Sequence, residues 1–231
     1  NNGNGTVRVF SYDGSNWTRI GDIAGSDGSA AGHSVSLSAD GKILAVGAPA
    51  TNEKTGSVDI FNYTGSSWKM MGNGINGAAV GDQAGHSVSL SSDGRTVAVG
   101  APTHDKDGDD DNRGHVRVFS YNGAQWSQMG GEIEGVNAGD KAGERASMSL
   151  SGDGKTVAVG SPYHDADGQP DDDNRGHVRV FSYNGTQWIQ VGGDINGLNA
   201  GDRAGESVIL SADGRTVVVG CLLYTSPSPR D

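Results

Sequence analysis

Two acidic loops contain the residue types in this 231-residue sequence that are best suited to binding chemistry. They span residues 104–113 and 164–175, and each begins with His-Asp and ends with Asp-Asn-Arg. Carboxylates at alternating positions, with a glycine for the bend, can converge on a hard cation such as Ca²⁺, which takes about six to eight oxygen ligands. The predicted calcium ligands are Asp105, Asp107, Asp109, Asp111, Asp165, Asp167, Asp171 and Asp173.

The same loops also fit a plain surface turn, because runs of like charge are commonly solvated. Counted from Asp105, the first acidic stretch departs from the EF-hand pattern, with Asp110 at the sixth position and Val116 at the twelfth. The corresponding residues 50–56 lack the aspartate cluster, so calcium cannot be needed in every such loop. The sequence leaves both interpretations open, the calcium site and the acidic turn.

Histidines flank the acidic loops in pairs, and imidazoles are good ligands for transition metals. The four histidines are His104, His115, His164 and His177. No cysteine and no second-shell pattern accompanies them in the sequence, and the surroundings are rich in oxygen. We therefore expect a hard ion, if any, rather than a transition metal.

The elements that must position these loops recur four times along the chain. The pattern Val-Arg-Val-Phe-Ser-Tyr at 7–12 returns with small changes at 58–63, 116–121 and 178–183. One tryptophan follows each copy: Trp17, Trp68, Trp126 and Trp188. A unit of about 50 to 60 residues matches one propeller blade better than one solenoid turn. The predicted domain spans 1–220, with repeat units at about 5–55, 56–113, 114–175 and 176–220.

Each unit is predicted to hold four short strands. Residues 87–91 alternate apolar with small polar types, and 96–100 alternate Val with Ala or Gly, which is typical of strands. The Asn-Gly pairs at 122–123 and 184–185 favour tight hairpins. Sheets stacked radially lie about 10 Å apart, so small residues permit the approach and Val and Leu fill the gap. We predict an all-β fold, a β-propeller of four-stranded antiparallel blades, with the chain a fragment of a larger propeller.

The segments 85–94, 97–102 and 114–119 together resemble the FG-GAP repeat, which builds the propeller of integrin α chains and of many bacterial and algal surface proteins. Gly-Ala-Pro is intact at 47–49 and 100–102. Alanine replaces the family's phenylalanine at Ala31, Ala84, Ala142 and Ala204. This matches a variant class in which Asp-Gly replaces the longer calcium loop. The resemblance covers residues 5–220 and implies a cell-surface propeller that binds a partner through its loops.

Composition narrows the classes of partner. A net charge of −11 argues against nucleic acid and anionic membranes, which need a basic patch. A spanning helix needs about 20 mostly apolar residues, and the longest candidate, 217–223, is far shorter. We expect a protein or glycan ligand, no nucleic acid, no direct membrane insertion, and an extracellular or cell-surface location. Residues 221–231 depart from the repeat, and we expect them to be a sequence artefact.

The leading functional prediction is a noncatalytic binding or adhesion module, with no catalytic and no cofactor-binding residue apart from the calcium ligands. His33 and His86 open equivalent strands, but Glu144 and Glu206 replace them later, so we interpret this position as a variable site near the axis. The alternative is a propeller glycosidase or lyase with an axial site, which needs residues that break the repeat symmetry. Glu144, Arg145 and Glu206 do so but are few. An intracellular scaffold of the WD-repeat type would require Trp-Asp endings, which are missing.

Overall fold

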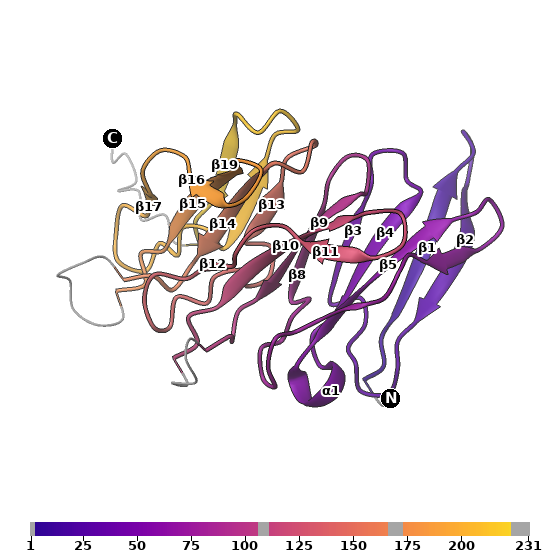
Figure 1. Ribbon diagram of the computed structural model, residues 1–231, viewed down its shortest axis with the longest axis horizontal. Helices are drawn as coiled ribbons and strands as arrows, with labels where there is room; N and C mark the ends of the chain where they lie inside the picture. The colour runs from indigo at the N-terminus through magenta and orange to yellow at the C-terminus, as the bar shows by residue number, and fades with distance from the viewer. Residues whose placement is uncertain (1–2, 106–110, 166–172, 223–231) are drawn as a thin grey trace, which may run out of the picture.

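The computed structural model of the protein describes residues 3–105, 111–165 and 173–222. It folds them into five antiparallel β-sheets that stand side by side along the long axis of the molecule (Figure 1). We number the sheets one to five in chain order. Within the described ranges the sole helix is the four-residue α1 (Thr51–Lys54). No helix in these ranges has the length and apolar character needed to cross a bilayer.

Sheets two, three and four share one plan, in which four strands form a meander and a fifth, two-residue strand pairs with the third. Sheet two holds β3 (Ser34–Leu37), β4 (Ile43–Ala48), β5 (Ser57–Tyr63), β6 (Trp68–Met70) and β7 (Ile75–Asn76). Sheet three holds β8 (Ser87–Leu90), β9 (Thr96–Ala101), β10 (His115–Tyr121), β11 (Trp126–Gln128) and β12 (Ile133–Glu134). Sheet four holds β13 (Met148–Leu150), β14 (Thr156–Ser161), β15 (His177–Tyr183), β16 (Trp188–Gln190) and β17 (Ile195–Asn196).

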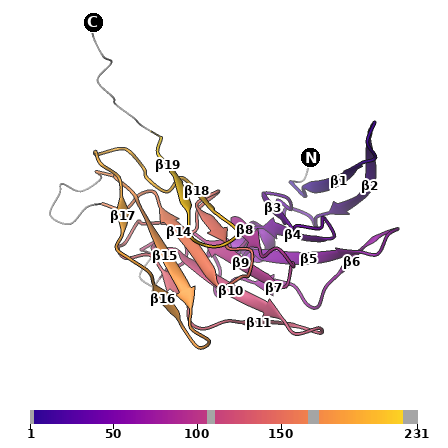
Figure 2. The ribbon, with the colours of Figure 1, turned by 90° about the horizontal axis from the view of Figure 1, so that it is seen from above.

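The outer two sheets have two strands each: β1 (Thr6–Tyr12) with β2 (Trp17–Ala24), and β18 (Ser207–Leu210) with β19 (Val217–Gly220). Figure 2 shows β3, β8 and β18 toward the middle of the molecule and β6, β11 and β16 at its periphery. The predicted all-β propeller is therefore confirmed. Each complete blade joins the second half of one sequence repeat to the first half of the next, and the short fifth strand adds to the predicted four.

The apolar core lies between neighbouring sheets rather than inside any one of them. Val58 and Ile60 of sheet two pack with Val97 and Val99 of sheet three, and all four are almost completely buried. An equivalent cluster joins sheets three and four, and smaller ones join the remaining neighbours. A sheet with two buried faces requires apolar residues on both, which explains the Val and Ala runs of β4, β9 and β14.

Serines connect the inner strands to one another. The Oγ atoms of Ser36, Ser89 and Ser149 each accept a hydrogen bond from a leucine N–H of the next inner strand, at 2.9 to 3.0 Å. Ser87 Oγ in turn donates to the carbonyl of Gly143 at 2.6 Å. The small polar residues therefore bond across the blade interface as well as permitting close approach. This ladder holds β3, β8, β13 and β18 side by side around one axis.

Candidate functional site

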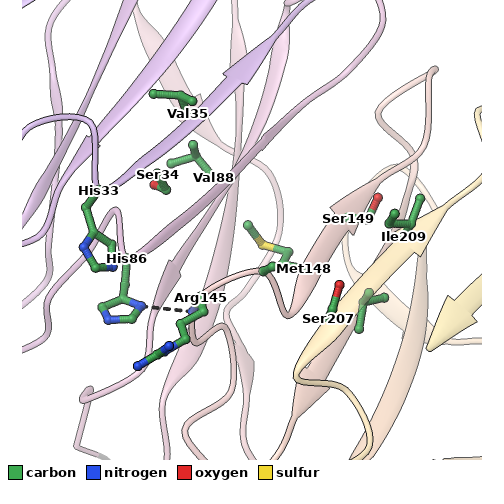
Figure 3. Close-up of a pocket in the computed structure, with 12 residues that line it drawn as sticks. His33, Ser34, Val35, His86, Val88, Arg145, Met148, Ser149, Ser207 and Ile209 are labelled. Carbon is green, nitrogen blue, oxygen red and sulfur yellow. Dashed lines mark hydrogen bonds between the residues drawn. The ribbon is translucent and has the colours of Figure 1, made fainter. Parts of the chain in front are cut away.

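The four inner strands and the loops before them enclose an axial pocket of about 710 Å³. This volume is typical of a small-molecule site. Its apolar wall includes Val35, Val88, Met148, Val208 and Ile209. Figure 3 shows His33, His86 and Arg145 gathered at one end of the pocket, with Ser149, Ser207 and Ile209 across from them. The pocket thus joins an apolar wall to basic and hydroxyl groups.

Arg145 reaches this pocket because the third inner strand is preceded by two extra residues. Residues 85–87, Gly-His-Ser, correspond to residues 143–147, Gly-Glu-Arg-Ala-Ser, and the strand registers that follow agree with this alignment. Arg145 adopts a left-handed backbone with φ 47°, which is uncommon for a residue other than glycine. The insertion breaks the repeat symmetry at the axis, where a purely structural repeat has no need of it.

His86 is fixed in orientation and in protonation state. The backbone N–H of Arg145 donates to His86 Nδ1 at 3.0 Å, so in the neutral ring the proton is on Nε2. Burial, together with the nearby charges of His33, Arg145 and Lys141, lowers the pKa of His86 from 6.5 to about 4. The rings of His33 and His86 lie 4.4 Å apart between centroids. At neutral pH, His86 therefore offers an N–H donor and no charge.

Two glutamates lie beside this group without lining the pocket itself. Burial raises the pKa of the Glu144 carboxyl, and the nearby Glu206 adds to this effect. Within the described chain, one carboxyl oxygen of each glutamate is buried and has no hydrogen-bond partner. Lys141 and Arg203 both lie over the ring of Tyr163, at 4.7 and 4.9 Å from its centroid.

A second kind of cluster occurs at one corner of sheet three, which we call the first histidine corner: Asp82, His104, His115 and Glu132. His104 Nδ1 lies 3.1 Å from Asp82 Oδ1, and His115 Nδ1 lies 3.3 Å from Glu132 Oε2. The two imidazole rings are in contact, 3.9 Å apart between centroids. Burial lowers the pKa of His115, so this imidazole is neutral at neutral pH.

The second histidine corner occupies the same place in sheet four: Asp140, His164, His177 and Asp194. His164 Nδ1 lies 3.0 Å from Asp140 Oδ1, and His177 Nδ1 lies 3.7 Å from Asp194 Oδ2. The ring centroids are again 3.9 Å apart. Burial and the neighbouring His164 lower the pKa of His177 to about 4. The four histidines could be singled out in the sequence, whereas their carboxylate partners could not.

The predicted calcium ligands fall into two groups. Asp107, Asp109, Asp167 and Asp171 lie outside the described residues. Asp105 and Asp165 accept hydrogen bonds from the backbone N–H groups of Asn112 and Asn174, both at 2.7 Å. Asp111 and Asp173 pair with Arg113 and Arg175, both at 2.6 Å. The described aspartates therefore close the base of each loop, and calcium binding by the loops stays a prediction.

The position of His33, His86, Glu144 and Glu206 was predicted to be variable and to have no catalytic role. In the structure His33 and His86 line the axial pocket, whereas Glu144 and Glu206 lie outside its lining. The insertion at Arg145 was the available signal. It could have been weighted more heavily, because a two-residue change in a regular repeat marks a site that the repeat does not explain.

Comparison with known proteins gave matches in structure only. No family profile and no curated protein sequence matches the chain. The periplasmic gluconolactonase PpgL of Pseudomonas aeruginosa aligns with a TM-score of 0.57 and 20% identity, over 94% of this chain and 57% of that one. A protein of unknown function from Desulfotomaculum acetoxidans aligns with a TM-score of 0.58 and 12% identity, over 93% of this chain and 55% of that one. A candidate 6-phosphogluconolactonase from Bacteroides uniformis aligns with a TM-score of 0.52 and 16% identity, over 82% of this chain and 47% of that one.

The chain spans about half the length of the solved structures that it matches. The prediction of a noncatalytic adhesion module, with no enzymatic activity, is wrong on this comparison. Propellers designated as lactonases are among the neighbours that overturn it. The physical reason for the error is that an axial pocket forms from strands far apart in sequence, so its convergent groups are invisible in a single repeat.

Proposed function

We propose that this protein is an enzyme-type propeller that hydrolyses an ester bond, such as that of a lactone, in a small sugar-derived molecule bound in the axial pocket. The observation that carries the proposal is the convergence of His33, His86 and Arg145 at one end of a pocket of about 710 Å³. A guanidinium and an uncharged imidazole N–H are donors suited to a carbonyl oxygen that becomes negative.

The proposed roles follow from the geometry of each group. His33 takes a proton from a water molecule, and the resulting hydroxide attacks the substrate carbonyl carbon. The Arg145 guanidinium and the His86 Nε2–H donate hydrogen bonds that stabilise the negative charge on the carbonyl oxygen. Collapse of the tetrahedral intermediate breaks the bond between the carbonyl carbon and the ring oxygen. The departing oxygen takes the proton from His33, which restores the neutral imidazole.

The remaining lining supports a sugar-derived substrate. Ser34, Ser149 and Ser207 offer hydroxyls, while Val88 and Ile209 offer an apolar surface. Of the ligand classes expected from the sequence, this favours the glycan class over a protein. The lactonase names among the structural neighbours support the reaction class, and the periplasmic location of one supports a compartment outside the cytoplasm, whether extracellular or at the cell surface. Assignment of the repeat to the FG-GAP class is part of the same proposal.

A second candidate, glycoside hydrolysis, is favoured by one specific observation. Glu144 has a raised pKa and lies near Glu206, and each has a buried carboxyl oxygen without a hydrogen-bond partner in the described residues. A pair of carboxyl groups acting together is the arrangement that glycosidases use. Because neither glutamate lines the pocket, we rank this candidate second.

A substrate panel tests both candidates with the purified protein. Aldonolactones are assayed in a pH-stat above their spontaneous hydrolysis, and nitrophenyl glycosides are assayed by absorbance. We expect lactone hydrolysis, with Arg145→Ala lowering kcat/KM by roughly 10²- to 10³-fold, as loss of one oxyanion donor does. The matched control is Arg95→Ala, which removes an exposed arginine beside the Asp93-Gly94 turn, away from the pocket lining.

The outcomes separate the candidates. Lactone hydrolysis that falls in Arg145→Ala and stays constant in Arg95→Ala supports the proposal. Glycoside cleavage that falls in Glu144→Gln would replace it with the second candidate. A lactonase rate that is equal in the wild type and in Arg145→Ala would contradict the assignment of this pocket, and no turnover of either substrate class would contradict both candidates.

A further inference from the structure

The two histidine corners present the same donors at the same places in two consecutive blades. Asp82, His104 and His115 each offer one ligand atom, and these atoms lie within 4.8 Å of one another. The same holds for the trio of the second corner: Asp140, His164 and His177. A tetrahedral ion with bonds of about 2.0 to 2.1 Å has ligand atoms roughly 3.4 Å apart, so only a small contraction is needed. These sites are distinct from the axial pocket.

Each corner contains a completely buried imidazole that lacks a well-formed hydrogen bond within the described chain. His115 and His177 are both 0% exposed, and the Nε2 atom of each has no partner. Their Nδ1 atoms face only the carboxylates of Glu132 and Asp194, at 3.3 and 3.7 Å. Buried polar atoms are nearly always bonded, so orphaned atoms require an explanation such as an ion. A neutral imidazole has a lone pair on one ring nitrogen, and this is the atom that binds a metal.

The equivalent corner of sheet two is an internal comparison. The strand registers place Ser57 where His115 stands, and Gly74 where Glu132 stands. The positions of His104 and Asp82 are taken by Thr51 and Ser29. Ser57 Oγ donates directly to Thr51 Oγ1 at 3.3 Å, so the two hydroxyls of this corner hydrogen-bond to each other. All four donors are therefore present together in two blades and replaced together in the third, as expected of ligands that act as a set.

Asp82 also closes a turn in its own loop, but that turn does not explain why histidines lie beside the carboxylate. Asp82 Oδ2 accepts hydrogen bonds from Ala78 N and Ala79 N, at 3.0 and 2.8 Å, and this leaves Oδ1 to face His104. Asp202 makes the equivalent turn with Leu198 N and Asn199 N. Because Asp202 has no histidine contact within the described residues, the turn needs only one carboxylate oxygen.

The charge balance at the corners also favours a cation. Asp82 and Glu132 bring two negative charges to the first corner, and the buried guanidinium of Arg117 offsets one of them. Asp140, Asp194 and Arg179 repeat this balance in the second corner. Imidazole nitrogens are ligands for borderline metals, whereas Ca²⁺ and Mg²⁺ prefer oxygen alone.

We propose that each histidine corner binds one divalent transition metal ion, with Zn²⁺ as the type, through its two imidazoles and its loop aspartate. Glu132 in the first corner and Asp194 in the second are placed to supply the fourth ligand. The first ion would link the loop before β8 to β10, and the second would link the loop before β13 to β15. Both lie at the base of an acidic loop.

The test is metal stoichiometry. The full chain is stripped with a chelator and titrated with Zn²⁺ by calorimetry in excess Ca²⁺, which occupies the acidic loops if they bind it. We expect two sites in the wild type. The double variant His104→Thr/His115→Ser, which copies the natural pair of sheet two, is expected to keep one site. Adding His164→Thr and His177→Ser is expected to leave none.

Further variants distinguish loss of a metal ligand from loss of binding through misfolding. His104→Gln and Glu132→Gln change partly exposed side chains, and each is expected to weaken one site at least tenfold. Asp202→Asn is the matched control and is expected to keep both sites. Co²⁺ bound in place of Zn²⁺ is expected to show visible absorption that the quadruple variant lacks. Absence of Zn²⁺ binding by the wild type, or two sites retained by the quadruple variant, would overturn the proposal.

Discussion

Histidine serves different purposes at different depths in this protein, and its surroundings decide which. His86 is partly buried beside cationic groups and accepts one backbone hydrogen bond, so it is a neutral donor in the pocket. His115 is completely buried beside carboxylates and its Nε2 is unsatisfied, so it is suited to a metal. The residue type alone predicts neither role. Desolvation and the neighbouring charges determine both.

His86 also makes folding stability depend on pH. Its pKa is 6.5 when unfolded and about 4 when folded, so the unfolded chain binds more protons between these values. Stability is fully present above pH 6.5 and is lost as the pH falls toward 4. Full burial would give about 3 kcal/mol, and we expect roughly half of that because the ring is partly solvated.

The variant His86→Asn isolates this effect, because an amide oxygen can accept the Arg145 N–H but cannot titrate. Urea unfolding of the wild type and of the variant is compared at about pH 7.5 and pH 4.5. We expect the stability difference between the two proteins to change by about 1 to 2 kcal/mol in favour of the variant at the lower pH. An unchanged difference would show that His86 is not buried as a neutral ring.

Partners that lie far apart in sequence set the limit of prediction at the residue scale. The sequence placed His104 and His115 beside an acidic loop, yet Asp82 lies 22 residues before His104, on a loop that only the fold brings near. The Asp93-Gly94 turn, in contrast, could be predicted fully. Asp93 Oδ1 accepts from Arg95 N at 2.9 Å, and Gly94 has φ 66°. Local chemistry determines such a turn, whereas a site depends on the register of distant strands.

At the scale of the strand, the glycine of the Gly-Ala-Pro pattern has a steric purpose. It is the penultimate residue of β4 and of β9, where the loop of the next blade passes closest. A Cβ atom on Gly100 would lie 2.2 Å from Ser87 Oγ and 2.3 Å from the carbonyl oxygen of Gly143. On Gly47 it would lie 2.1 Å from the carbonyl oxygen of Gly85. Close packing of successive blades therefore requires glycine here, independently of φ.

Two alanine substitutions test this explanation. Gly100→Ala is expected to destabilise the protein by about 2 to 3 kcal/mol, because backbone atoms of the next blade must move. Gly131→Ala is the control, since its Cβ would meet nothing within 4 Å and its φ is not left-handed. We expect it to change stability by less than about 1 kcal/mol in either direction. Equal effects in chemical denaturation would show that conformational freedom, rather than contact, determines the glycine.

The strands themselves were predictable because the alternation of residue types repeats four times. The serines of the inner strands were expected to permit close approach, which they do. Their hydrogen bonds to the next blade were not foreseen, because Ser89 and its partner Leu150 are 61 residues apart. The tryptophan that recurs in every unit is not equally buried in all of them. Trp17 is 69% exposed, since β1 and β2 have no sheet packed over that ring within the described chain.

At the scale of the whole molecule, stability arises at the interfaces between blades, as in other repeat proteins. Trp126 Nε1 donates to the carbonyl of Met71 at 2.9 Å, which joins sheet three to sheet two. Trp188 Nε1 donates to the carbonyl of Met129 at 2.7 Å and joins sheet four to sheet three. Trp68 holds the same place in sheet two, but its Nε1 is buried without a partner in the described residues. Within the described residues, the interface between sheets one and two therefore lacks this bond.

Replacing each tryptophan by phenylalanine measures that difference, because the ring stays and the N–H is lost. Trp126→Phe and Trp188→Phe are each expected to lower the free energy of unfolding by about 1 kcal/mol beyond the effect of the smaller ring, which is the net contribution of one such hydrogen bond. Trp68→Phe loses only the ring area and removes an unsatisfied N–H, so we expect the smallest loss of the three. Urea midpoints at constant m-value provide the measurement. A loss at Trp68 as large as at Trp126 would mean that the indole rings, and not their hydrogen bonds, link the blades.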